Sequence, residues 1–79
     1  MHYVYVLKSE KDNNLYIGCT SEIKNRLAMH NAGKVRSTKS RVPFILIYSE
    51  EIEDKYEAFR KEIYYKTPKG KKELVLKIK

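Results

Sequence analysis

Two short runs of β-branched and aromatic residues near the start of the chain limit most strongly what it can fold into. The runs are YVYVL (Tyr3–Leu7) and LYIGC (Leu15–Cys19), and the polar stretch KSEKDNN separates them. β-Branched and aromatic residues favour β-strands, and the Asp and Asn residues between the two runs are typical of turns. The pattern therefore predicts a β-hairpin.

The chain has only 79 residues, so we expect one domain over residues 1–79. A domain this short buries roughly 60–65% of its unfolded surface, which leaves a thin core and only an open groove for an active site. The single Cys19 excludes an internal disulfide, and the ligand spacing of a zinc site is absent. No apolar run approaches about 20 residues and no signal-peptide pattern opens the chain, so we expect a cytoplasmic protein.

A first helix is expected after the hairpin. Thr20 or Ser21 is a suitable N-cap and Gly33 a suitable stop. Between them, Ile23 and Leu27 lie four residues apart, on one face of the helix.

A basic loop and a third strand are expected next. Residues 33–43 (GKVRSTKSRVP) have four basic residues and no apolar period, which indicates a mobile loop. Residues 44–48 (FILIY) form a continuous apolar run, which predicts a strand buried on both faces.

The last part of the chain predicts two more helices. Asp54 followed by Glu57 resembles a capping box, and the helix that it begins should end near Lys66, because Thr67 precedes a proline. The predicted buried stripe of this helix is Tyr56, Phe59 and Ile63. Residues 69–79 (KGKKELVLKIK) predict a last short helix. The order β-β-α-β-α-α indicates an α+β domain with a small antiparallel or mixed sheet.

The net charge of +7 is unevenly distributed along the chain. Residues 19–48 carry six bases and one acid (+5), residues 49–62 carry six acids and three bases (−3), and residues 66–79 carry six bases and one acid (+5). Basic surfaces attract polyanions by releasing counterions, so the pattern is compatible with nucleic-acid binding. It is equally compatible with a lysine-rich surface that only keeps a small protein soluble.

Several polar residues are expected at the margins of the buried helix faces. At about 100° per residue, Arg26 and His30 border the Ile23–Leu27 stripe, and Glu62 borders the stripe of the second helix. Each has an ordinary structural explanation: an ion pair of Arg26 with Glu22, a helix-dipole contact for His30, and an ion pair of Glu62 with Lys66. Strand tyrosines commonly only pack, and Gly18 can serve only to permit a bend.

Taken together, however, these residues resemble the GIY-YIG nuclease domain. The match consists of YVY (Tyr3–Tyr5), ten residues, YIG (Tyr16–Gly18), Arg26 and His30 in RLAMHNAG, then RVPFILIYSEE, and Glu62 in EAFRKE. The chain most resembles the small stand-alone bacterial members, the YhbQ-like group, and the resemblance runs from about Tyr3 to Leu76. Tyr3 replaces the Gly of GIY, which that group commonly tolerates. The Lys66–Pro68 segment also departs from the usual pattern, which puts the support of Glu62 in doubt.

The resemblance implies a three-stranded antiparallel sheet flanked by helices and a phosphodiesterase site. It implies that Tyr5 takes a proton from water, that Arg26 holds the phosphate, and that Glu62 binds Mg²⁺ or Mn²⁺. Tyr16 helps to bring the groups together. An unperturbed tyrosine pKa near 10 leaves only about one phenol in ~10³ ionised at neutral pH, so the base is either Tyr5 or a proton-sharing Tyr5–His30 pair.

The expected substrate is DNA, single-stranded or structured, with RNA as an alternative. The chain has no recognition helix or zinc finger, and related repair and homing enzymes take their targeting from extra domains, so we expect weak sequence preference. We expect a monomer with no membrane partner. The alternatives to a metal-dependent endonuclease are a nucleic-acid-binding module with little activity and a protein-interaction adaptor. The residues expected to grip phosphates are Lys34, Arg36, Lys39 and Arg41.

Overall fold

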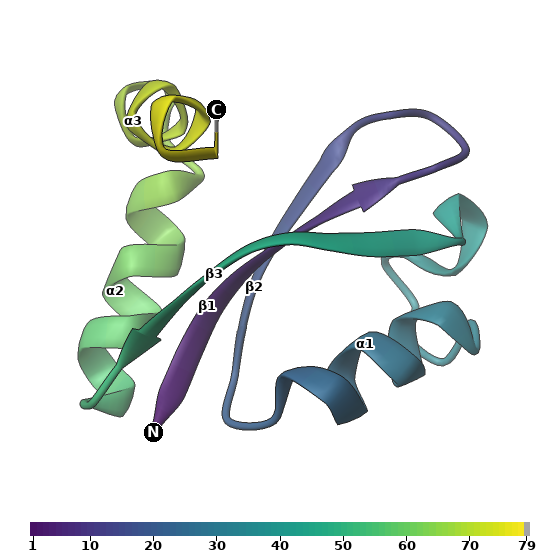
Figure 1. Cartoon of the computed structure of the whole chain (residues 1–79), viewed down its shortest axis with the longest axis horizontal. Coiled ribbons are helices and arrows are strands. Elements are labelled where there is room, and N and C mark those ends of the chain that lie inside the picture. Colours follow the sequence, from purple (N-terminus) through teal and green to yellow (C-terminus); the bar gives the residue numbers. More distant parts are fainter. Residues whose placement is uncertain (79) are drawn as a thin grey trace.

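The structure, a computed structural model, describes residues 1–78 and has the predicted order of strands and helices. The strands β1 (His2–Ser9), β2 (Leu15–Thr20) and β3 (Phe44–Ile52) form one antiparallel sheet in the order β2-β1-β3. The twisted sheet separates α1 (Ile23–Asn31) from α2 (Lys55–Tyr65) and α3 (Pro68–Ile78) (Figure 1). A 3₁₀ turn, η1 (Lys39–Arg41), precedes β3. The expected α+β fold with a three-stranded antiparallel sheet is confirmed.

The central strand β1 is buried on both faces and divides the interior into two cores. Because successive side chains of a strand point to opposite faces, Val4 and Val6 face one way, and Tyr5 and Leu7 the other. The α2-side core consists of Val4, Val6, Ile17, Ala58, Tyr65 and Leu74. The α1-side core consists of Tyr5, Leu7 and Phe44, with Tyr16, Leu27 and Val42 packed against it.

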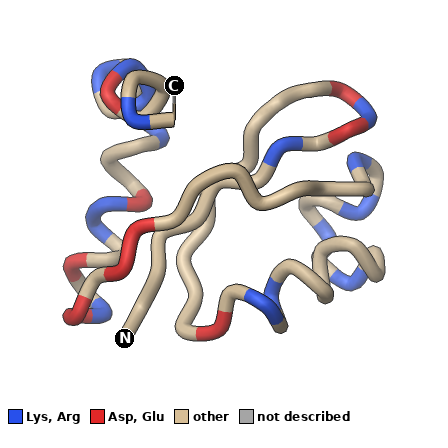
Figure 2. The backbone as a smooth tube through the Cα atoms, in the orientation of Figure 1, with Lys and Arg blue, Asp and Glu red and all other residues tan. Residues whose placement is uncertain are grey.

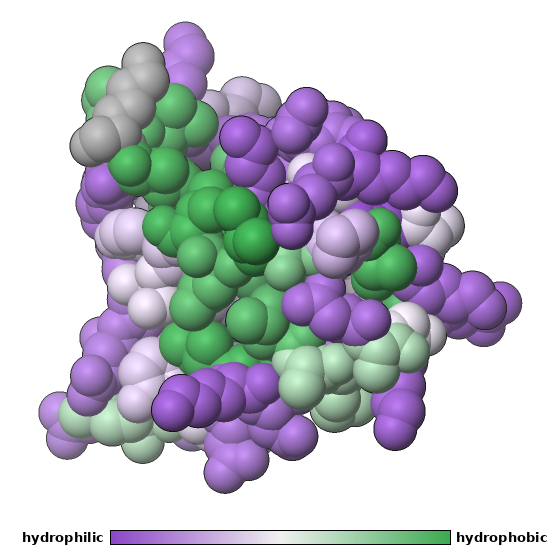
Figure 3. Space-filling model, turned by 45° about the vertical axis from the view of Figure 1, so that its right-hand side comes forward, coloured by the Kyte–Doolittle hydropathy of each residue, from purple (hydrophilic) through white to green (hydrophobic). Residues whose placement is uncertain are grey.

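The third strand is not buried on both faces as predicted. Phe44 is buried, but Ile45 and Leu46 are 45% and 39% exposed. β3 pairs only with β1 and forms an edge of the sheet, and a domain of this size has no further layer to cover it. Hydrophobic surface is accordingly visible in the middle of one face of the molecule (Figure 3).

The start of α1 also differs from the prediction. The N-cap is Glu22, with no side-chain cap, and neither Thr20 nor Ser21 takes that role. Thr20 Oγ1 instead accepts a hydrogen bond from the backbone N–H of Glu22 at 3.2 Å, which forms a turn before the helix. The end is as predicted, because Gly33 follows the helix with a φ of 74°.

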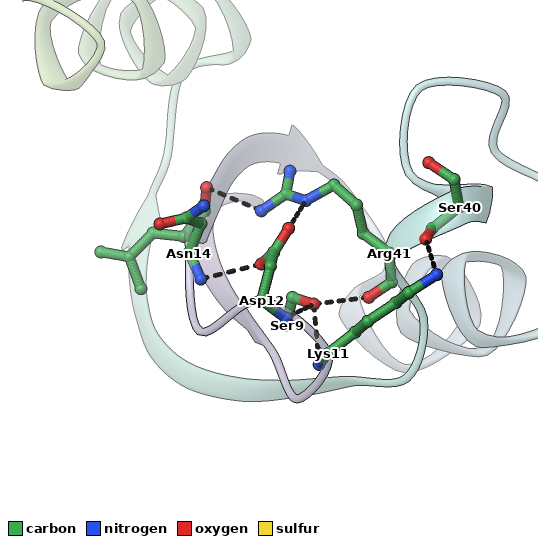
Figure 4. A network of polar contacts seen from close by, with 7 residues as sticks. Ser9, Lys11, Asp12, Asn14, Ser40 and Arg41 are labelled. Atoms are coloured by element: carbon green, nitrogen blue, oxygen red, sulfur yellow. Dashed lines mark hydrogen bonds and ion pairs between the residues drawn. The ribbon is translucent and has the colours of Figure 1, made fainter.

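Residues 33–43 are packed against the hairpin, not a mobile loop as predicted. Val35 and Thr38 are buried in this segment. The Ser9 hydroxyl donates to the Arg41 carbonyl at 2.6 Å, and Arg41 Nε donates to Asp12 Oδ2 at 2.9 Å (Figure 4). Lys11 Nζ donates to the Ser40 carbonyl at 3.1 Å. The predicted loop was inferred from its polar composition, but long-range hydrogen bonds hold it in place.

The ends of α2 and the start of α3 agree with the predictions. The Asp54 side chain accepts a hydrogen bond from the Glu57 N–H at 3.2 Å, and α2 ends at Tyr65. Thr67 Oγ1 then accepts from the Gly70 N–H at 3.0 Å, just inside α3. A side chain thus caps the start of α2 and of α3, whereas α1 begins without one.

The predicted buried stripe of α2 is wrong. Tyr56, Phe59 and Ile63 are 68%, 56% and 51% exposed, whereas Ala58 and Tyr65 are buried. Ala58 is small and lets the helix pack closely on the sheet through the side that carries Ala58 and Tyr65. Measured around the helix axis, this buried face lies about 100° or more from the predicted one. Glu62 still lies at the margin of the buried face, but on its other side.

Candidate active site

Tyr5 lies at the centre of the α1-side face and depends on Gly18 for its position. The two residues are opposite one another in the β1–β2 pair. A Cβ atom at position 18 would overlap the Tyr5 hydroxyl, and the Gly18 backbone is not in the left-handed region. Gly18 therefore provides space for a phenol to lie across the neighbouring strand, and the bend suggested by the sequence is not its main role.

Buried hydrogen bonds connect Tyr5 to α1 and to the segment after it. The Tyr5 hydroxyl lies 3.0 Å from His30 Nε2, and His30 Nδ1 lies 2.7 Å from Thr38 Oγ1. Thr38 Oγ1 donates to the Val35 carbonyl at 3.4 Å. His30 and Thr38 are fully buried. Three segments of the chain thus meet in one line of polar groups.

The partners of these groups assign the proton positions. Arg26 Nε donates to the Tyr5 oxygen at 3.4 Å, so the Tyr5 hydrogen is left to donate to His30 Nε2. The Thr38 hydrogen is directed to the Val35 carbonyl, so His30 Nδ1–H donates to Thr38. This assignment satisfies every group in the chain. It leaves His30 Nε2 as the acceptor of the tyrosine proton.

The surroundings keep both Tyr5 and His30 neutral. Burial raises the pKa of Tyr5, although the hydrogen bond from Arg26 works against that rise. Burial, and then the positive charge of Arg26, lowers the pKa of His30. The hydrogen bond with Tyr5 raises the pKa of Arg26, which stays charged. The site thus holds a neutral phenol, a neutral imidazole and a fixed cation.

Aromatic rings, and hydrogen bonds of the neighbouring Asn31 side chain to the backbone of Phe44, hold His30 in place. The Tyr16 ring lies edge-on to His30 with centroids 5.0 Å apart, and the Phe44 ring is 5.9 Å away. The next residue, Asn31, accepts from the Phe44 N–H at 2.7 Å and donates to its carbonyl at 3.1 Å. The end of α1 is thereby attached to the start of β3.

Glu62 approaches the same end of the sheet from α2. Its side chain is 15% exposed and pairs with Lys66 at 2.8 Å, one turn along the helix. It lines a hollow together with Thr20 and Ser21 at the end of β2. Its negative charge contributes to the raised pKa of Tyr5, after the larger effect of burial. The five predicted site residues therefore come from the hairpin and from helices on opposite faces of the sheet.

The chain is similar to known proteins over most of its length. Residues 1–74 match the GIY-YIG catalytic domain. The chain is 49% identical over 67 residues to the UPF0213 protein SH2523 of Staphylococcus haemolyticus, covering 84% of this chain and 80% of the relative. It is 41% identical over 80 residues to the UPF0213 protein YazA of Bacillus subtilis, covering 99% and 80%.

The chain belongs to the GIY-YIG family. Among solved structures it is similar to the solution NMR structure of the UPF0213 protein BH0048 from Bacillus halodurans. That similarity has a TM-score of 0.57 at 35% sequence identity and covers 94% of this chain and 81% of the other. The resemblance to the GIY-YIG catalytic domain and to its small bacterial members is confirmed.

GIY-YIG nucleases use a divalent metal, and the groups near Glu62 fit one that is shared with substrate. Within residues 1–78 no three His, Cys, Asp or Glu side chains gather to enclose an ion. Mg²⁺, however, is commonly held by one or two carboxylates, with waters and substrate phosphates as the other ligands. Glu62 supplies one carboxylate, and the hydroxyls of Thr20 and Ser21 line the same hollow. Glu62 would hold the ion.

The residues predicted to bind phosphate differ in how free they are. Lys34, Arg36 and Lys39 are exposed on the segment after α1, and further Lys and Arg residues occur on α1, α2 and α3 (Figure 2). Arg41 is engaged in the ion pair with Asp12 and lies over the Phe44 ring. The first three therefore stay predictions as phosphate contacts, and Arg41 contributes to the docking of the segment.

Across residues 1–78, no helix is long and apolar enough to cross a membrane.

Sequence reasoning missed Thr38, Asn31 and Phe44. All three position His30, but each acts through a contact between distant parts of the chain. Thr38 lies in the stretch that was predicted to be a mobile loop. No sequence pattern predicts a contact between a histidine and a polar residue eight positions later. Of the structural explanations, the Glu62–Lys66 pair is present, while no Arg26–Glu22 pair occurs among the ion pairs of residues 1–78.

Proposed function

We propose that this protein is a divalent-metal-dependent endonuclease that hydrolyses DNA phosphodiester bonds with weak sequence preference. The observation that carries the proposal is the buried chain from Tyr5 through His30 to Thr38, with Arg26 on the Tyr5 oxygen. Stability alone does not require a phenol and an imidazole in a small hydrophobic core. A base next to a permanent cation is what cleavage of a phosphodiester requires.

The proton relay begins with water. As a water oxygen attacks phosphorus, its proton passes to the Tyr5 oxygen, while the Tyr5 proton passes to His30 Nε2. The P–O bond to the leaving sugar oxygen breaks in the same displacement, and that oxygen takes up a proton from solvent. His30 becomes an imidazolium, and Thr38 accepts from its Nδ1–H throughout. Tyr5 ends the step as a neutral phenol, so no free phenolate is needed.

The free-energy cost of moving the Tyr5 proton favours this relay over a mechanism in which Tyr5 ionises before the attack. Ordinary pKa values of about 10 for Tyr and 6.5 for His make transfer of the proton from Tyr5 to His30 cost about 5 kcal/mol. Burial raises the first pKa and lowers the second, which increases that cost in the free protein. Proton transfer therefore belongs to the attack step, when water supplies a proton to Tyr5 at the same time.

Charge stabilisation is assigned to Arg26 and Glu62. The Arg26 guanidinium does not titrate and is partly buried, so its charge acts on the phosphate with little screening. A divalent ion bound at Glu62 would supply further positive charge to the phosphate and the leaving oxygen. The exposed Lys34, Arg36 and Lys39 would hold the flanking phosphates without reading sequence.

The test is a cleavage assay on labelled single-stranded, duplex and branched DNA with Mg²⁺ or Mn²⁺ and with EDTA. Cleavage by the wild type is expected only with metal. Tyr5→Phe and Glu62→Gln should each lower the rate by about 10²–10⁴-fold while DNA binding persists. Lys61→Gln, at a neighbouring position of α2, is the control that should retain activity.

The main alternative is a nucleic-acid-binding module of the same fold. It would bind DNA in a salt-sensitive manner and cut none of the substrates under either metal. Salt-dependent binding lost on neutralising Lys34, Arg36 and Lys39 together, with no cleavage, would replace the nuclease proposal by this one.

A further inference from the structure

Two aromatic side chains lie exposed next to the candidate metal-binding carboxylate. Tyr56 and Phe59 of α2 are 68% and 56% exposed. Both line the same hollow of about 560 Å³ as Glu62, between α2, the start of β1 and the end of β2. Hollows of this size accept small flat ligands. The α2 stripe that the sequence indicated as core is therefore a surface beside the active site.

Away from Glu62, where a metal ion would be shared with a substrate phosphate, the charge around the hollow does not favour a phosphate. Acidic residues gather at the end of β3 and the start of α2 (Figure 2). Lys55 is the only Lys or Arg in the lining, and the carboxylate of Glu62 also lines the hollow. Arg26 lies instead on α1, and the exposed Lys34, Arg36 and Lys39 lie on the segment that follows it. The sugar–phosphate backbone therefore belongs on the Arg26 side, which leaves the hollow for an uncharged group.

The lining is suited to a nucleobase. Aromatic side chains stack on bases of any identity, at about 1–3 kcal/mol per base. His2, in the wall of the hollow, has a buried Nδ1 with no hydrogen-bond partner among residues 1–78. Such an orphan atom weakens the free protein, and the polar edge of a base would satisfy it once the ring turns. Stacking surface and an unsatisfied polar group thus occur in one hollow.

We propose that this hollow is a base-binding subsite, in which a nucleobase adjacent to the scissile phosphate stacks on Phe59 and Tyr56. The inference rests on the proposed nuclease function, because Glu62 is shared by the two. A base inside a duplex cannot reach the hollow without leaving the stack, and unpairing is least costly where the base is already unpaired. The subsite therefore selects nucleic acid with an unpaired nucleotide at the cleavage point.

Binding is tested without cleavage, in EDTA, using single strands that carry 2-aminopurine at successive positions. The fluorescence of this base reports stacking. Binding to the wild type should change it at one or two positions, and Phe59→Ala should abolish that change and weaken binding by about tenfold to a hundredfold. Tyr56→Ala should have a smaller effect. Ile63→Ala is the matched control, because Ile63 is 51% exposed on the same helix but lies outside the hollow.

A second measurement locates the base relative to the cut. In the metal-containing assay, one abasic site is moved along the substrate. Wild-type cleavage should fall about tenfold or more when the abasic site occupies one fixed position beside the scissile bond. Phe59→Ala, which has already lost the stacking contact, should be insensitive to it.

The outcomes separate the two proposals. Fluorescence changes that depend on Phe59 but not on Ile63, without cleavage under any metal, would support the subsite and overturn the nuclease. Cleavage with equal fluorescence changes in Phe59→Ala and Ile63→Ala would overturn the subsite and leave the nuclease intact. Equal cleavage of a fully paired duplex and a single strand would also overturn the subsite.

Discussion

The two faces of β1 differ in chemistry although they are built from alternate residues of one strand. Val4 and Val6 face a mainly apolar core closed by α2 and α3, whereas Tyr5 and Leu7 face the side of the sheet where His30 and Thr38 form the polar chain. The first face buries apolar atoms and makes few demands on orientation. The second contains groups that are satisfied only when three distant segments meet. We infer that stability depends mainly on the α2 side and reactivity mainly on the α1 side.

Polar groups on the α2 side have a different purpose from those on the α1 side. Tyr48 and Tyr65 both donate to Glu50 Oε2, and Lys77 Nζ lies 3.3 Å from the same atom. Burial works against the charge of Glu50, but these hydrogen bonds hold its pKa below the usual range. Burial and the contact with Glu50 raise the pKa of Tyr65 to about 12. This network joins α3 to β3 and keeps Glu50 and Lys77 paired in their charged forms. The Tyr5–His30 chain, by contrast, can transfer a proton.

The largest effect that separates the two faces is expected from Leu74→Ala. Leu74 is fully buried in the α2-side core, so the truncation should lower the free energy of unfolding by about 2–5 kcal/mol. Urea unfolding followed by circular dichroism measures the change. The rate of cleavage per folded molecule should be unaltered, since Leu74 belongs to the α2-side core and Tyr5 to the α1-side core. Leu76→Ala, at a 72% exposed position two residues on, is the control and should change little. A large loss of rate per folded molecule in Leu74→Ala would show that the faces are not separable.

A smaller effect, on the other face, is expected from Thr38→Val. The substitution keeps the shape but removes the oxygen that accepts from His30, which leaves a buried N–H unsatisfied at a cost of about 1–3 kcal/mol. Part of this cost should appear as a lower cleavage rate and a shifted pH–rate profile, because the His30 tautomer is no longer selected. Thr38→Ser, which retains the hydroxyl, should restore both. If Thr38→Ser and Thr38→Val have the same profile, Thr38 has only a packing role.

The smallest effect is expected from pH. Because the pKa of His30 is lowered in the folded protein, the unfolded chain binds a proton below about pH 6.5 that the folded chain does not. Stability should therefore decrease as the pH falls below about 6.5, with a slope of up to about 1.4 kcal/mol per pH unit, until the folded protein binds the proton as well. Arg26 is the charged group that faces His30, while burial raises the pKa of Tyr5 and keeps it neutral. His30→Gln should flatten the slope in urea titrations, and an unchanged slope would contradict a buried neutral His30. Glu50, with its lowered pKa, adds a further loss only below about pH 4.5.

Much of the fold followed from local pattern. The hairpin, the Asp54 cap, the stop at Gly33 and the break before Pro68 each depend on a few neighbouring residues, and all were predicted correctly. The errors concern burial. β3 was expected in the interior because FILIY is apolar, and α2 was expected to bury Tyr56, Phe59 and Ile63 for the same reason. Hydrophobicity indicates which residues can be buried, but a small domain has too little interior for all of them.

The candidate site divides in the same way. The sequence by itself determined which side chains are candidates for the site, because their type, order and spacing are recognisable. These residues are Tyr5, Tyr16, Arg26, His30 and Glu62. Only the tertiary structure decided that Tyr5 donates to His30, that Gly18 makes room for Tyr5, and that Thr38 completes the chain. Spacing along one strand or helix is set by covalent geometry and can be read locally. Contacts between segments depend on how the whole chain packs, which no local period encodes.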